Sequence, residues 1–314
     1  MKIASGTGTI IKSYEWYILK IYSSLTPWCV PVFIMISGAL FLNRNDSIRK
    51  IYSKNITRII TAFLFWSFFY AIVQYFYKHW TRAEFFANFL LGHYHLWFLF
   101  MIICLYMLIP LIRKITESDF LVKYFLFLTL IFAFVLPQVL SFITCISEDY
   151  GALMSKFLNK FELYRVLTEN TGYFLLGYYL TKAPITKKTE YMIYAAGMIG
   201  YAAYIAVDLY ISEDKSIYPV CNVLAESIAI FVFFMKHCPN NPVLVRCMSV
   251  LSRWTFGAYL VHDVVKKFIA ILGLKALSFN PAIAAPLAVT VIFIVSFMVS
   301  CVLNSIPVLK KYIV

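Results

Sequence analysis

The sequence predicts an all-α membrane protein: a polytopic helical membrane bundle with about nine transmembrane helices, forming a single domain over residues 1–314. Of the 314 residues, 62% are hydrophobic and only 14% are charged, whereas a soluble domain carries about a quarter charged residues. Nine stretches contain the roughly 20 apolar residues with which an α-helix crosses a bilayer. Runs such as Phe125–Leu136 do not alternate in polarity, so they lack the pattern of a membrane β-barrel. Helices, by contrast, satisfy their own backbone hydrogen bonds in lipid.

The predicted spans follow one another along the chain after an interfacial segment, residues 1–21. Tyr14, Trp16 and Tyr17 in that segment suit the headgroup level, which amphipathic rings favour. The fifth span contains charged residues, and Lys266 and Lys267 interrupt the eighth. The nine spans are Ser24–Leu42, Ile56–Tyr77, His95–Ile112, Lys123–Ile146, Leu163–Thr181, Glu190–Ile211, Tyr218–Met235, Trp254–Val265 with a continuation toward Gly273, and Pro281–Leu303.

The net charge of +13 follows the distribution of a membrane protein. If the first span runs from outside to inside, most Lys and Arg residues fall on inner loops, which is the positive-inside bias. The basic residues therefore set the orientation, and they form no stripe that would indicate binding to nucleic acid. The bias predicts that Val314 faces the cytoplasm and that Met1 lies outside.

An outward Met1 requires something to carry it across the membrane. Gly6, Thr7 and Gly8 stand where a signal peptide would have its apolar core. The simplest interpretation is one more helix upstream of this sequence. The alternative is a protein with nine spans whose short N-terminus translocates behind its first helix.

The cysteines predict neither a disulfide framework nor a metal site. None lies in a Cys-x-x-Cys pair, and most occur in or near apolar spans, where free cysteine packs as a small hydrophobic residue. They are Cys29, Cys104, Cys145, Cys221, Cys238, Cys247 and Cys301.

Two histidines are candidates for proton transfer, since histidine titrates near neutral pH. His95 opens its span in the sequence His-Tyr-His-Leu-Trp, near the outer interface and beside Trp97. The alternative for His95 is an interfacial residue of an aromatic belt. His262, followed by Asp263, lies roughly 12 Å inside the cytoplasmic end of its span, where an ionisable group is costly. The alternative for His262 is a neutral side chain that bonds the carbonyl of a neighbouring helix.

Three further polar residues are candidates for a site. Arg58 begins the second span on the cytoplasmic side, and its planar guanidinium could hold a diphosphate or serve as a topological anchor. Glu226 lies mid-span, where a carboxylate costs about 3 kcal/mol, with Asn222 one turn earlier on the same helix face. This pair predicts a polar cavity, and a paired structural Glu is the alternative. Ser37 and Gly38 predict a close helix–helix contact.

Three segments form recognisable motifs: VPVFIMISGALFL at Val30–Leu42, GHYHLWFLFMIICLYMLIPLIR at Gly92–Arg113, and FGAYLVHDVV at Phe256–Val265. Together they resemble acyltransferase family 3, which includes peptidoglycan, O-antigen and capsular-polysaccharide O-acetyltransferases. Members usually begin with a helix that bears an Arg and, about ten residues later, a His taken as catalytic, and neither is present here. Asn55 stands where the family often has the first Arg of Arg-x-x-Arg.

The resemblance implies an O-acyltransferase of the bacterial cytoplasmic membrane. Acetyl-CoA would be the donor, no metal would be needed, and the acceptor would be a hydroxyl of a surface polysaccharide or its lipid-linked precursor. The alternatives are a polysaccharide exporter or flippase of the same fold, or an inactive truncated member. The candidate catalytic residues are His95, His262 and Glu226, and the candidate substrate-binding residues are Arg58, Trp97, Tyr106, Asn222 and Asp263.

These residues are expected to line one internal cavity at graded depth. Arg58 would lie at the inner mouth, His262 and Glu226 near the middle, and His95 near the outer face. The cavity is expected to be open on the side where an upstream helix would pack.

Overall fold

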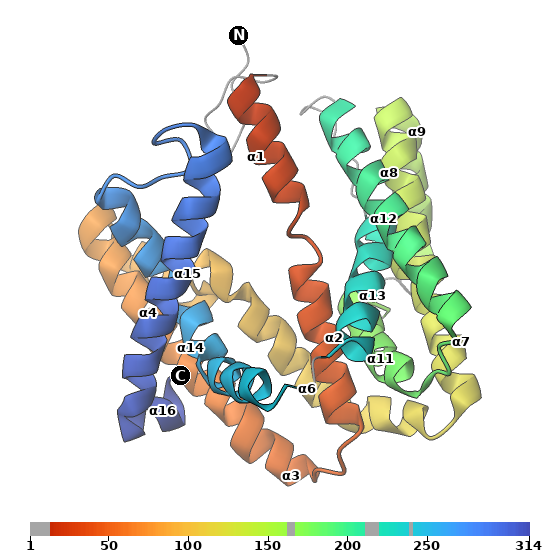
Figure 1. Cartoon of the computed structure of the whole chain (residues 1–314), viewed down its shortest axis with the longest axis horizontal. Helices are drawn as coiled ribbons and strands as arrows, with labels where there is room; N and C mark the ends of the chain where they lie inside the picture. The colour runs from red at the N-terminus through yellow and green to blue at the C-terminus, as the bar shows by residue number, and fades with distance from the viewer. Residues whose placement is uncertain (1–12, 162–166, 211–219, 239–240) are drawn as a thin grey trace. The chain divides into compact units, whose positions relative to one another are not determined.

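The computed structural model describes residues 13–161, 167–210, 220–238 and 241–314, and every regular element in these ranges is a helix (Figure 1). The prediction of an all-α protein is therefore confirmed. The chain forms two compact units, each built from two separate stretches. One unit comprises Met1–Asn45 and Ile109–Cys238, and the other comprises Asp46–Leu108 and Pro239–Val314.

Helix α6 (Trp97–Thr116) crosses the division between the units, and the remaining helices belong to one unit or the other. The first unit contains α1 (Tyr14–Ser24), α2 (Cys29–Leu42), α7 (Asp119–Thr129), η3 (Leu130–Val135), α8 (Leu136–Ile146), α9 (Glu148–Leu158), η4 (Asn159–Phe161), α11 (Glu169–Lys182), α12 (Lys187–Tyr210) and α13 (Val220–Lys236). The second contains α3 (Ile48–Lys50), η1 (Ile51–Ile56), α4 (Thr57–Lys78), α5 (Arg82–Leu91), η2 (Tyr94–Leu96), α14 (Pro242–Ile271), α15 (Pro281–Ser305) and α16 (Pro307–Tyr312).

Five helical segments of the described residues are long and apolar enough to cross a bilayer. Each segment contains one predicted span in full: the first, second, third, fourth and ninth. The other predicted spans fall on α11, α12, α13 and α14, although parts of the fifth, sixth and seventh lie outside the described residues. The count of nine therefore stays a prediction. The five segments are Tyr14–Leu42, Ile48–Lys78, Arg82–Thr116, Asp119–Ile146 and Pro281–Ser305.

Two boundaries differ from those that the sequence predicted. Lys266 and Lys267 do not interrupt a helix, because α14 continues through both of them to Ile271. Each lysine forms an ion pair with Asp263, one turn earlier, so their charges are compensated within the helix. The third span begins as an α-helix at Trp97, because His95 lies in the short 3₁₀ turn η2.

In the first unit, two glycines bring α2 and α11 into backbone contact. A Cβ atom added at Gly38 would lie 1.7 Å from the Phe174 carbonyl oxygen, and one added at Gly177 would lie 2.0 Å from that of Met35. Neither position can therefore hold a side chain. The close contact predicted at Ser37 and Gly38 is confirmed.

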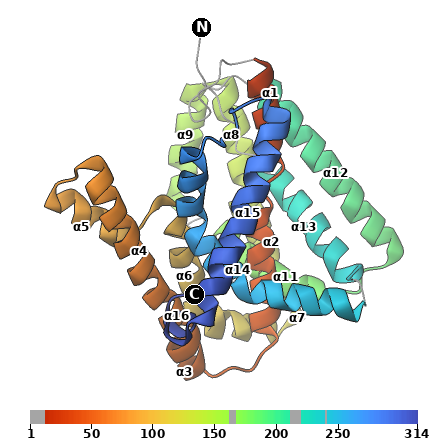
Figure 2. The ribbon, with the colours of Figure 1, turned by 60° about the vertical axis from the view of Figure 1, so that its left-hand side comes forward.

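In the second unit, side chains that bond to backbone carbonyls fix the helices to one another. The Tyr70 hydroxyl on α4 donates to the Leu260 oxygen on α14 at 2.8 Å, and Ser300 on α15 donates to the Trp254 oxygen at 2.7 Å. Trp66 donates to the carbonyl oxygen of Ile313 at 3.1 Å, which fastens the chain after α16 to α4. Helix α5 folds back against α4 (Figure 2). The turn that follows α5 carries the candidate site.

Candidate active site

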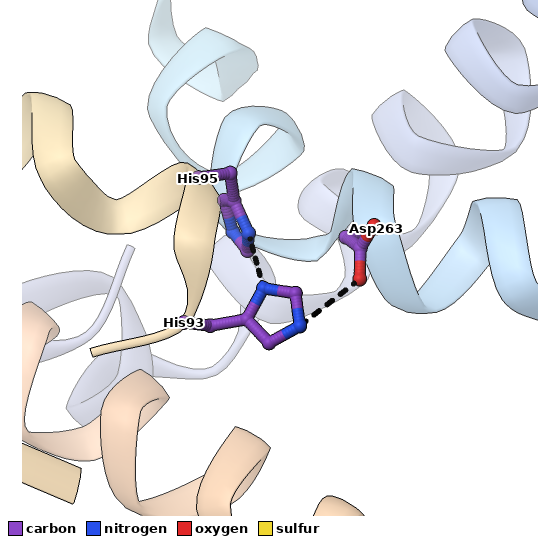
Figure 3. Close-up of side chains that lie close together, drawn as sticks. All are labelled: His93, His95 and Asp263. Atoms are coloured by element: carbon purple, nitrogen blue, oxygen red, sulfur yellow. Dashed lines mark hydrogen bonds and ion pairs between the residues drawn. The ribbon is translucent and has the colours of Figure 1, made fainter. Parts of the chain in front are cut away.

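A glycine turn after α5 places two histidines in the interior of the second unit. Gly92 has φ +76°, and a Cβ atom there would lie 2.7 Å from the ring of Phe63, so the turn requires glycine. The chain then passes through η2, where His93 and His95 are 8% and 6% exposed. Both side chains project from this short turn toward α14 (Figure 3).

His93, His95 and Asp263 form a connected chain of polar groups (Figure 3). The Nδ1 atoms of the two histidines are 2.9 Å apart, so one of them must donate to the other. The Nε2 atom of His93 lies 3.5 Å from Oδ2 of Asp263, whose exposed fraction is 0%. The Nε2 atom of His95 is buried and has no hydrogen-bond partner among the described residues. An unpaired buried nitrogen costs about 1–3 kcal/mol, which makes it a natural contact point for a substrate group.

Asp263 is held by two lysines and a tyrosine. Lys266 Nζ lies 2.9 Å from Oδ1, and Lys267 Nζ lies 2.9 Å from Oδ2. Spacings of three and four residues place all three side chains on one face of α14. Tyr94 donates to Oδ1 at 2.6 Å and accepts from Lys266 at 2.8 Å. A buried carboxylate needs such partners, because desolvation of an unpaired charge is costly.

Aromatic side chains fix the orientation of both histidine rings. Tyr70 stacks on His93 with ring centroids 4.4 Å apart, and Tyr259 donates to the backbone oxygen of His95. The His262 ring meets that of His95 at 4.9 Å, nearly perpendicular. His262 Nδ1 lies 2.5 Å from the Tyr259 carbonyl oxygen, so it donates there and leaves Nε2 with a lone pair. His262 thus bonds a backbone carbonyl, as the alternative interpretation predicted, but this carbonyl belongs to its own helix and not to a neighbouring one.

A cavity of about 870 Å³ opens beside this cluster, within the size range of small-molecule sites. Three residues of the cluster network, His93, Tyr94 and Lys267, form part of its wall, with the Lys267 ammonium 3.3 Å from His93 Nε2. The lining residues are Val73, Gln74, Tyr77, Lys78, Asn88, Gly92, His93, Tyr94, Lys267, Ala270, Ile271 and Lys275.

The structure brings some of the predicted site residues together. His95, His262 and Asp263 share the cluster, and Trp97, 52% exposed, follows two residues after His95. Tyr106 lies further along α6 and is 9% exposed. None of these five residues lines the cavity itself, which meets the cluster at His93, Tyr94 and Lys267.

Arg58 lies at the opposite end of α4 from the cavity. It precedes Tyr70 by twelve residues, about 18 Å along the helix. Its guanidinium donates to the Val314 backbone oxygen at 2.5 Å and lies 5.7 Å from the centre of the Phe256 ring. Arg58 is nevertheless exposed, so part of its donor fork remains accessible.

Glu226 and Asn222 lie on α13 in the other compact unit. Asn222 donates to the Gly200 carbonyl oxygen at 3.0 Å and so ties α13 to α12. Glu226 is 8% exposed, and within the described ranges its Oε2 atom has no hydrogen-bond partner. A shared cavity that joins these residues to Arg58 and His262 stays a prediction.

Sequence reasoning missed His93, which stands two residues before His95. The available signal was the His-x-His spacing next to Gly92, because a turn at a glycine can point both rings the same way. Lys266 and Lys267 were treated as an interruption of a span rather than as partners of Asp263. Tyr70 and Tyr259 carried no distinguishing signal, since they are aromatic residues within apolar spans.

His93, His95 and Asp263 could each offer one ligand atom to a metal ion, with these atoms within 4.8 Å of one another. The charges around Asp263 oppose a cation there, because two ammonium groups already face its carboxylate. The Nδ1 atoms that face each other suit a shared proton. The donor set is therefore better suited to proton transfer than to metal binding.

The match to known families decides the assignment. An acyltransferase-domain family matches residues 3–305. The chain belongs to acyltransferase family 3. No curated protein and no solved structure shows significant similarity to it. The apolar helices and the family together make this acyltransferase a multi-pass membrane protein.

Proposed function

We propose that this acyltransferase moves an acetyl group from cytoplasmic acetyl-CoA to a hydroxyl of a surface polysaccharide or its lipid-linked precursor. It would act in a bacterial cytoplasmic membrane and need no metal. The observation that carries the proposal is the buried chain from Asp263 through His93 to His95, which lies beside a cavity large enough for a saccharide.

The chain of polar groups gives each histidine a role. Nε2 of His93 faces both Oδ2 of Asp263, at 3.5 Å, and the Lys267 ammonium, at 3.3 Å. We assign the tautomer whose Nε2–H points to Oδ2 of Asp263, because that oxygen has no hydrogen-bond partner among the described residues. The Nδ1 lone pair of His93 then accepts from the Nδ1–H of His95. This arrangement leaves a lone pair on the unpartnered Nε2 of His95. His95 is then the base, while His93 and Asp263 are positioning residues that stabilise the charge it acquires.

The transfer step follows from these roles. His95 Nε2 takes the proton as the acceptor O–H bond breaks, and the Nδ1 proton of His95 passes to His93. The acceptor oxygen forms a bond to the acyl carbon, the thioester C–S bond breaks, and the leaving thiolate takes the proton back from the relay. The positive charge on the histidines is formed next to Asp263, which favours it electrostatically.

The donor would approach from the end of the unit where Arg58 lies. Its guanidinium fork matches the oxygens of the coenzyme A diphosphate. Phe256, which lies beneath Arg58, precedes His262 by six residues, or about 9 Å along α14. A thioester arm that extends beyond the diphosphate could cover that distance, so Arg58 and His262 are assigned to donor binding.

Transfer of labelled acetyl from acetyl-CoA to a saccharide acceptor in proteoliposomes tests the proposal. His95→Gln should lower kcat by about 10²–10⁴-fold, as expected for loss of a general base. His237→Gln is the matched control, because His237 is exposed, stacks on Phe233 and belongs to the first unit, whereas the cluster belongs to the second. Equal activity of the wild type and His95→Gln would overturn the proposed mechanism. Saccharide transport without acetyl transfer would instead support the exporter alternative.

A further inference from the structure

We infer that the cavity beside His93 binds a negatively charged group of the acceptor, a carboxylate or a phosphate attached to a sugar. Three lysines, Lys78, Lys267 and Lys275, line this cavity, and no Asp or Glu is among its lining residues. This inference deepens the proposed function, on which it rests, by naming the class of acceptor.

Two of the three lysines have no countercharge. Within the described ranges, neither Lys78 nor Lys275 has an ion-pair partner, and both residues are exposed. The Lys78 ammonium lies 5.5 Å from the centre of the Trp80 ring, a cation–π contact that brings no negative charge. A positive charge without a partner at the wall of a cavity favours an anionic ligand there.

The third lysine connects the anion site to the proposed proton relay. Lys267 forms an ion pair with Asp263, and its side chain is still 45% exposed. Its ammonium is 3.3 Å from His93 Nε2. An anion held by Lys78 and Lys275 would therefore place the rest of the sugar next to the histidines, and Lys267 would contribute to both sites.

The three lysines do not lie where basic residues that set the membrane orientation are expected, which is in the inner loops. Lys78 and Arg58 are twenty residues apart on α4, about 30 Å, which equals the thickness of the bilayer core. In the predicted orientation the cavity is at the outer end, where the positive-inside bias disfavours lysine. The three lysines thus run against the general charge distribution. The ion pair with Asp263 accounts for Lys267, and an anionic ligand accounts for Lys78 and Lys275.

The other lining residues suit a sugar. Gln74 and Asn88 carry amides that can both donate to and accept from hydroxyl groups. Tyr77 and Tyr94 add aromatic surface with a polar tip. Binding sites for small polar ligands combine such apolar walls with a few placed polar groups.

Binding of a matched pair of disaccharides to the full protein in nanodiscs of neutral lipid, without donor, tests the inference. The probes are cellobiouronic acid, which carries one carboxylate, and cellobiose, its neutral counterpart. The acid should bind at least about tenfold more tightly at low salt, and the preference should shrink at high salt, where exposed charges are screened. A lipid-linked diphosphosaccharide forms the third arm, so that a phosphate is also tested as the anion source.

Charge removal provides the control. Lys78→Gln with Lys275→Gln should lower the preference for the acid to about threefold or less, and Lys275→Glu should lower it further. Both lysines are exposed, so folding should be retained. Lys156→Gln, an exposed lysine of α9 that does not line the cavity, should leave the preference unchanged.

The outcomes separate the two proposals. Preferential binding of the lipid-linked probe, lost in the double variant, supports the inference with phosphate as the anion. Equal binding of acid and neutral probes, together with binding of the lipid-linked probe that the double variant does not weaken, overturns the inference and leaves the proposed function intact if the enzyme transfers acetyl. An intact preference for anions in a protein that transfers no acetyl overturns the proposed function. An unchanged preference in both charge variants also overturns the inference.

Discussion

Asp263 shows at the scale of a single residue how a buried charge is kept in an apolar protein. Its carboxylate has no exposed surface, and two ammonium groups, a tyrosine hydroxyl and an imidazole surround it. The lysines are themselves about half exposed, so they remain partly hydrated while they neutralise the carboxylate. The free-energy cost of burying the Asp263 carboxylate is thereby lowered by two ammonium groups that themselves stay partly hydrated.

Asp263→Asn should lower kcat strongly and stability only moderately. The amide keeps the size of the side chain but leaves His93 without its anion, so we expect about a 10²-fold loss of kcat with little change in KM for acetyl-CoA. The two lysine ammonium groups can regain hydration in this variant. The free energy of unfolding should therefore fall by about 1–2 kcal/mol, less than the 3–5 kcal/mol lost when one partner of a fully buried ion pair is removed.

Steady-state kinetics and thermal unfolding in detergent would measure both effects for this variant. Asp119→Asn is the control, because Asp119 forms an exposed ion pair with Lys123 and both residues belong to the first unit, not to the unit that holds the cluster. A parallel fall in stability and in both kinetic constants would mean that Asp263 serves only the fold.

The sequence located most of this cluster but not its connectivity. His262 and Asp263 stood out because ionisable residues within an apolar span need partners, and His95 stood out through its motif. That Asp263 reaches His95 through His93 depends on φ at Gly92 and on the packing of η2 against α14. Neither can be read from hydrophobic patterns, because those define which residues face inward and not which of them meet.

Helix packing in the first unit depends on the reciprocal contact of α2 and α11. Each helix presents a glycine to the backbone of the other, at Gly38 and Gly177. Small residues allow this approach, and in lipid van der Waals packing replaces the hydrophobic effect as the force between helices. The pattern Ser-Gly-Ala in α2 signalled the contact, but the partner helix could not be identified from sequence.

Gly177→Val should destabilise the protein severely. The added Cβ would lie 2.0 Å from the Met35 carbonyl oxygen, which is main chain and cannot move without shifting α2. We expect a loss of at least about 3 kcal/mol, at the upper end for overpacking, seen as a lower unfolding temperature in detergent. Leu40→Val, on the exposed side of α2, is the control and should change little. Unchanged stability of Gly177→Val would contradict the contact.

Two variants of Glu226 test whether this buried polar residue of α13 serves structure or function. Glu226→Leu should be at least as stable as Glu226→Gln, because Oε2 of Glu226 has no hydrogen-bond partner among the described residues and an apolar side chain removes this unsatisfied buried atom. Thermal unfolding of both variants, with acetyl transfer measured in parallel, would decide. Higher stability and full activity of Glu226→Leu would remove Glu226 from the candidate catalytic residues.

For the molecule as a whole, composition was enough to predict an all-α membrane protein, and the family followed from three motifs. Division into two compact units was not predictable, because each unit joins stretches far apart in the chain. Hydropathy alone overstates the length of some predicted spans: α11 and α13 have 14 and 17 residues in the described part of the chain, fewer than the roughly 20 that cross a bilayer upright.

The orientation of the second unit is the property on which the proposed chemistry depends most. Donor binding at Arg58 and acceptor binding at Lys78 require that the two ends of α4 face opposite sides of the membrane. In a variant whose native cysteines are replaced, Ser53→Cys should react with an impermeant thiol reagent only from the cytoplasmic side. Phe279→Cys, in the loop before α15, should react only from outside. Both positions are exposed, so access to the thiol depends on topology rather than on burial. Labelling of both cysteines from the same side would mean that α4 does not cross the bilayer, and a transfer route from Arg58 to the cavity along this helix would then be impossible.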